Sequence, residues 1–111
     1  ESETIAKALT AIAKGWEWTH ANPQEAVKLT VEAYPQLDLD VELETIPRIL
    51  SLSFDETTAA GGWGTFDPAA IEEQISVYDQ IGQFTSGAPA PEDVYATKIL
   101  EMTAADRPKI G

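Results

Sequence analysis

Residues 14–27 have the sequence KGWEWTHANPQEAV, and the fold prediction starts from this stretch. Two tryptophans end one helical segment, and a second segment begins almost at once. Asn22 is a favoured N-cap residue, and Pro23 suits the first helical position because that position needs no N–H donor. Glu25 follows Asn22 at the spacing of a capping box. The stretch therefore predicts a tight junction between two helices.

Apolar residues on both sides of this junction recur at helical spacing. Upstream, they predict a helix over residues 2–21, with Trp18 away from the main stripe and either covering a second contact or partly exposed. Downstream, a second helix begins at Pro23, and Pro35 ends it. The upstream stripe consists of Ile5, Ala8, Leu9, Ile12, Ala13 and Trp16.

Residues 37–44 alternate apolar and acidic side chains, which is a strand pattern. Asp and Glu are poor strand formers, and the following apolar residues also fit helical spacing. We therefore expect a helix over about 40–53, with Asp40 as its N-cap. Pro47 falls inside this helix and should kink it or shift its start.

The second half of the chain alternates loops with helix-start signals. Residues 55–66 form the main predicted loop. Asp67 and the proline after it begin a fourth helix, which Gly82 ends, and Pro91 begins a fifth. The sequence thus predicts an all-α chain of about five irregularly packed helices and no strand. Residues 1–103 form the helical domain or subdomain, and 104–111 a flexible tail.

Composition narrows the classes of function. The formal net charge of -12 argues against binding nucleic acid or anionic lipid through bulk electrostatics. The absence of cysteine excludes disulfides and thiol nucleophiles within this sequence. No apolar run approaches the length of a membrane span. The chain starts with Glu1 and no initiator methionine, so we expect a processed chain or a piece of a longer one.

No combination of residues predicts catalysis, a metal site or a cofactor. His20 is the only histidine, it has no nucleophile motif beside it, and we expect it to cap or pack at a helix end. The acidic run at 38–44 lacks the glycine and glutamate spacing of a calcium loop. The pair Glu72 and Glu73 suits the first turn of a helix. We therefore expect a protein that is not an enzyme.

One loop is a candidate ligand site. Gly62 and Trp63 lie in a glycine-rich segment that is neither a Walker loop nor a dinucleotide fingerprint. An indole ring beside accessible backbone amides can stack on a heterocycle and donate hydrogen bonds to it. The alternative is that Trp63 packs onto the helices and only closes the loop.

The junction also carries a resemblance. The segments Lys14–Trp16 and Asn22–Ala26 resemble the C-terminal part of ABC-transporter solute-binding proteins of the nitrate/sulfonate/taurine and thiamine-pyrimidine-precursor group. The later glycine-tryptophan-glycine loop, the helix ending at Gly82 and the last helix after a proline look similar too. The resemblance covers most of this chain but only about the last third of such a protein.

The resemblance implies a fragment of a two-lobed α/β periplasmic-binding-protein fold. Such a protein captures a small solute, here a pyrimidine precursor, a sulfonate or a similar molecule, and delivers it to an ABC permease. It would be periplasmic or extracellular, with a lipoprotein anchor as one form. Most solute contacts would come from lobes outside this sequence. The isolated helices would then expose apolar surface or self-associate.

Two other functions compete with this interpretation. The eukaryotic pyrimidine-precursor synthases look similar to the same family and are enzymes, with catalytic residues outside the matched region. A free-standing acidic helical module would instead bind a partner through an apolar groove or through Trp18 and Trp63.

Overall fold

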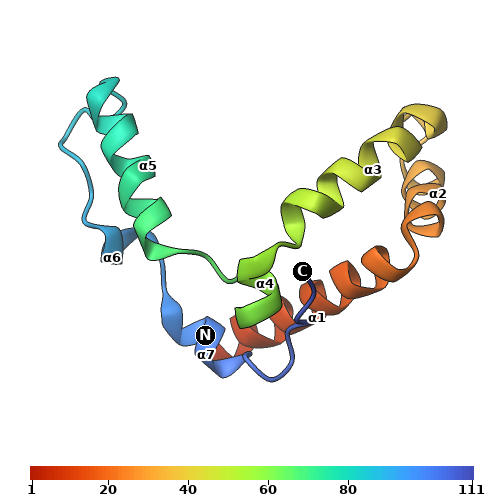
Figure 1. Ribbon diagram of the computed structural model, residues 1–111, viewed down its shortest axis with the longest axis horizontal. Helices are drawn as coiled ribbons and strands as arrows, with labels where there is room; N and C mark the ends of the chain where they lie inside the picture. The colour runs from red at the N-terminus through yellow and green to blue at the C-terminus, as the bar shows by residue number, and fades with distance from the viewer.

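Seven helices and no strand make up the computed structural model, which describes all residues 1–111 (Figure 1). The predicted all-α class is confirmed, although the helices number seven and not about five. Their bounds are α1 Ser2–Ala21, α2 Pro23–Ala33, α3 Leu39–Ser53, α4 Glu56–Gly61, α5 Pro68–Gln80, α6 Pro91–Val94 and α7 Thr97–Met102.

The junction between α1 and α2 lies where the sequence predicts it, but its capping differs. Asn22 separates the two helices, and Pro23 begins α2. The Asn22 side chain makes no N-cap hydrogen bond, so the predicted capping box with Glu25 is wrong. Instead, Asn22 Nδ2 donates to the Trp18 carbonyl at 3.0 Å, and its backbone N–H donates to the same oxygen at 2.8 Å. The Asn22 side chain therefore donates to the end of α1 and does not cap the start of α2.

Residues 39–53 form α3, so the strand alternative is wrong. The helix begins one residue before the predicted start because Asp38, and not Asp40, is its N-cap. Asp38 Oδ1 accepts from the backbone N–H groups of Asp40 and Val41 at 3.0 and 3.1 Å. The helix continues through Pro47, which lacks the N–H that the Leu43 carbonyl would normally accept from.

Removing the Asp38 cap gives a testable prediction for α3. The Asp38→Ala substitution leaves two first-turn N–H groups without an acceptor, so we expect the free energy of unfolding to fall by about 1 kcal/mol. Urea denaturation followed by circular dichroism measures this loss. The control is Asp40→Ala, which removes an acidic residue from the same first turn without removing the cap. An equal loss in both proteins would contradict the capping role.

Two other predicted segments are corrected. The predicted loop at 55–66 contains α4, because Asp55 and Thr58 form a reciprocal capping box around its first turn. The predicted fifth helix is two short helices, α6 and α7, separated at Tyr95, whose backbone is extended. At this break, the Tyr95 ring packs edge-on against Phe66 at a centroid distance of 4.8 Å. Asp67 caps α5 and Gly82 follows it at φ +72°, both as predicted.

The helices form an open arrangement. In Figure 1, α1, α2 and α3 make a U-shaped turn, while α5 projects away from it and the chain returns through α6 to α7 beside α1. The radius of gyration is 16.8 Å, against about 13 Å for a compact domain of this length. The fold therefore has no single centre on which all seven helices converge.

The hydrophobic core is correspondingly small. Only nine of the 111 residues are buried, and four of these are hydrophobic: Ala6, Ala13, Val27 and Phe54. Fourteen large apolar side chains are exposed, among them Ile12 at 53% and Leu52 at 86%. The helices thus have amphipathic faces that this chain does not cover.

The C-terminal segment, residues 103–111, packs against the rest of the chain. The sequence predicts a flexible tail from residue 104, because Pro108 prevents a helix from continuing there. In the structure, Thr103, Arg107 and Pro108 are buried, and the Thr58 hydroxyl donates to the Ile110 carbonyl at 2.7 Å. The segment is irregular in conformation, but side-chain and backbone hydrogen bonds hold it against α4 and the loop that follows.

Candidate functional site

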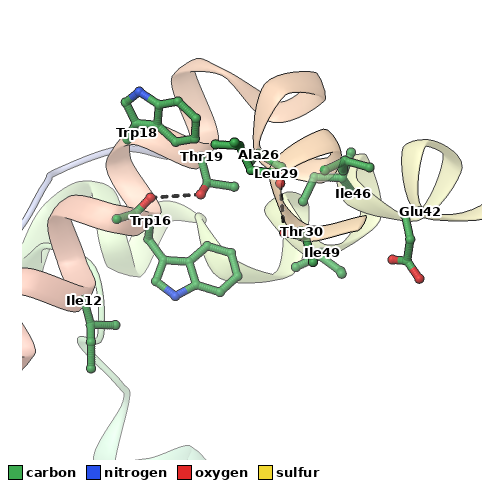
Figure 2. Close-up of a pocket in the computed structure, with 12 residues that line it drawn as sticks. Ile12, Trp16, Trp18, Thr19, Ala26, Leu29, Thr30, Glu42, Ile46 and Ile49 are labelled. Carbon is green, nitrogen blue, oxygen red and sulfur yellow. Dashed lines mark hydrogen bonds between the residues drawn. The ribbon is translucent and has the colours of Figure 1, made fainter. Parts of the chain in front are cut away.

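An apolar groove of about 540 Å³ lies between α1, α2 and α3 (Figure 2). Its volume lies within the range of small-ligand sites, roughly 300–1,000 Å³. The groove exists because α2 joins α1 and α3 at one end and leaves their facing sides apart. We call it the α1–α3 groove; it is lined by Ile12, Gly15, Trp16, Trp18, Thr19, Ala26, Val27, Leu29, Thr30, Glu42, Ile46 and Ile49.

Little polar chemistry is available inside this groove. The Thr19 hydroxyl donates to the Gly15 carbonyl at 2.9 Å, and the Thr30 hydroxyl donates to the Ala26 carbonyl at 2.8 Å. Both hydroxyls are therefore engaged with their own helices, as the dashed lines in Figure 2 show. Glu42 is the only charged residue of the lining and stands at the far end of the groove from Ile12 (Figure 2). The groove can thus hold an apolar body beside a single carboxylate.

The two tryptophans of the junction occupy different positions. Trp16 lines the groove and also stacks on Trp63, with ring centroids 5.9 Å apart and ring planes 23° from parallel. Trp18 lies at the groove with 44% of its surface exposed, which is the partly exposed position that the sequence leaves open. The neighbouring His20 packs edge-on against Phe54 at 4.8 Å, in keeping with the packing role expected of it.

The candidate ligand residues Gly62 and Trp63 lie outside the groove. Their backbone amides are already engaged: Gly62 N–H donates to Thr58 O, and Trp63 N–H donates to Pro108 O, each at 2.8 Å. The Trp63 ring is half-buried against Trp16. In this conformation the loop does not offer the two free amides on which its predicted ligand role depends. Contact between this loop and a ligand stays a prediction.

Arg107 is a functional candidate that the sequence reasoning missed. Its side chain is only 6% exposed, and its guanidinium donates to oxygens of the 62–65 loop and to Leu100 O. Burial lowers the pKa of Arg107 below its usual value, because the charged form is removed from water. The only sequence feature that could have pointed to this residue is the arginine itself, which directly precedes Pro108.

Comparison with protein-family models, curated proteins and solved structures gives no match for this chain. None of its helices combines the length and the apolar character that crossing a membrane requires.

Proposed function

We propose that this chain is the C-terminal helical part of a two-lobed α/β solute-binding protein. Such a protein captures a small molecule, a pyrimidine precursor, a sulfonate or a similar solute, and delivers it to an ABC importer. The chain itself is not catalytic under this proposal. Its place would be periplasmic or extracellular, and its partners are the solute, reached through the other lobes, and the permease.

The observation that supports this proposal most is the large accessible surface of the chain. The chain exposes 7786 Å² of accessible surface, whereas a compact monomer of 12.0 kDa exposes about 6,000 Å². The excess of about 1,800 Å² is roughly twice what one partner contributes to a standard interface. An excess of this size is more typical of helices that form part of a larger folded unit than of a complete small domain.

The distribution of charge agrees with this proposal. The chain carries 26 charged residues, yet the α1–α3 groove is lined by only one of them, Glu42. Charge depletion at the centre of a patch is typical of surfaces that become buried. The other acidic side chains lie outside the groove lining, where they keep the protein in solution. The groove is therefore the part of the surface that the rest of the protein would cover.

The test uses the full product of the reading frame that encodes this chain. We expect that product to be about three times as long as this chain and to carry an export signal. Thermal-shift measurements with pyrimidine precursors and sulfonates should then find a stabilising solute, since a ligand at a hundred times its Kd adds about 2.7 kcal/mol to stability. A reading frame that encodes only these residues would contradict the proposal and favour the alternative, an acidic helical module that binds a partner in its groove.

Trp63 separates packing from solute contact in the full-length protein. Because the indole stacks on Trp16, we expect Trp63→Ala to lower the melting temperature and leave solute affinity unchanged. Titration calorimetry measures the affinity, and Trp18→Ala is the control because it removes an indole at the groove and leaves the 62–65 loop unchanged. A loss of affinity confined to Trp63→Ala would assign this ring, and with it Gly62, to the ligand site.

A further inference from the structure

The C-terminal strap, which we define as residues 103–111, reaches back to a loop more than forty positions earlier in the sequence. In Figure 1 it is the dark blue end of the chain, which leaves α7 and finishes beside α4. Two of its contacts are made by its backbone: Pro108 O accepts from Trp63 N–H at 2.8 Å, and Ile110 O accepts from the Thr58 hydroxyl at 2.7 Å. The strap therefore lies directly on the loop that carries Trp63.

The Arg107 guanidinium makes four hydrogen bonds from the strap to other parts of the chain. Its Nη1 lies 3.0 Å from Gly62 O, 2.8 Å from Trp63 O and 3.0 Å from Thr65 Oγ1. Its Nη2 donates to Leu100 O, at the end of α7, at 3.2 Å. One side chain thus joins two segments that are far apart in sequence, with a different nitrogen facing each of them.

The chemistry of these contacts suits the two terminal nitrogens of an arginine. All four acceptors are neutral oxygens, and the buried Nε has no hydrogen-bond partner. Burying a charge without a carboxylate is unfavourable unless several dipoles compensate for it. Two loop carbonyls converge on Nη1 and supply that compensation. A lysine has one nitrogen in place of the two that face the loop and Leu100, so it cannot reproduce both sets of contacts in the same positions.

The loop that Arg107 contacts has an unusual backbone path. Gly62 and Gly64 both have positive φ, at +88° and +85°, so the backbone follows a path that most sequences avoid. The Trp63 side chain leaves this loop and stacks on Trp16, which in turn lines the α1–α3 groove. A chain of contacts therefore runs from the strap through the loop to one wall of the groove.

We propose that Arg107 is a positioning residue, which holds the 62–65 loop in its observed path and thereby keeps Trp63 stacked on Trp16. This role is separate from solute transport, because all the contacts involved lie within this chain. Its test needs no solute, so the outcome is independent of whether the proposed transport function holds.

The stacked indoles provide a spectroscopic signature. Two indole rings this close couple their transitions and give an exciton couplet in circular dichroism. The Trp63→Phe protein defines the spectrum without the couplet, and Trp18→Phe should leave the couplet in place. We expect Arg107→Met and Arg107→Lys to lose the couplet to the level of Trp63→Phe while keeping their helical signal.

Control variants separate positioning from general stability. Lys109→Met removes an exposed cation of the same strap, and Asp38→Ala weakens the fold at α3; both should keep the couplet. If Arg107→Met does not fold, Thr65→Val removes a single acceptor of Nη1, and we expect it to reduce the couplet in part. A full couplet in folded Arg107→Met, or in Thr65→Val when Arg107→Met is unfolded, would overturn the proposal.

Discussion

Replacing Gly62 by alanine is expected to lower the free energy of unfolding by about 3 kcal/mol, from two causes of about 1–3 kcal/mol each. The first is backbone strain, because Gly62 lies at φ +88° and ψ +157°, a region that only glycine adopts readily. The second is crowding: an added Cβ would lie 3.1 Å from Arg107 Cβ, 3.2 Å from its carbonyl oxygen and 3.3 Å from Nη1. Urea denaturation measures the loss.

Gly64→Ala is the matched control for this substitution. Gly64 has a similar φ of +85°, but nothing lies within 4 Å of its added Cβ. Gly64→Ala should therefore lower the free energy of unfolding only by the strain of the left-handed backbone, about 1–2 kcal/mol. The difference between the two alanine variants then measures the contact between Gly62 and the C-terminal strap. Equal losses at both glycines would mean that the strap does not press on the loop in solution.

The second large effect concerns the isolated 111-residue chain, which we expect to associate as its concentration rises. The exposed apolar side chains of the α1–α3 groove supply the driving force, and the net charge of -12 on each chain opposes it. Salt screens the repulsion between chains, so association should strengthen as salt is added. Sedimentation equilibrium at several protein and salt concentrations measures both trends.

Substitutions on and off the groove locate the associating surface. Ile12 lines the groove and is 53% exposed, so we expect Ile12→Asp to weaken the association constant by at least about tenfold, equivalent to about 1.4 kcal/mol. Leu52 is 86% exposed but does not line the groove, and Leu52→Asp should change association far less. A chain that stays monomeric and binds no apolar dye would show that this surface is not free to associate.

Most helix positions could be predicted because their signals are local. The apolar spacing upstream of Trp16 and the proline at position 23 predict α1, α2 and the junction between them, and the structure confirms all three. The capping details were less predictable, because Asp38 and Asp40 carry the same chemistry two residues apart. The helix α4 was missed although Asp55 and Thr58 have the spacing of a capping box, since the glycines that follow favoured a loop.

The candidate site was less accessible to sequence reasoning. Trp63 was singled out from the sequence as a residue of the loop, but its stacking partner lies 47 positions earlier, at Trp16. The α1–α3 groove depends on the angles between three helices, and the apolar spacing within one helix carries no information about those angles. The sequence predicted that the end of the chain would be free, whereas Arg107 anchors it.

The all-helical class, the main helix boundaries and the acidic surface followed from residue order, because caps, prolines and apolar spacing act within a few residues. The open arrangement, the groove and the anchored C-terminal strap came from tertiary contacts. The reason is that Arg107 Nη1 donates to acceptors more than forty residues away in the sequence, and at that separation spacing along the chain carries no information about distance in space.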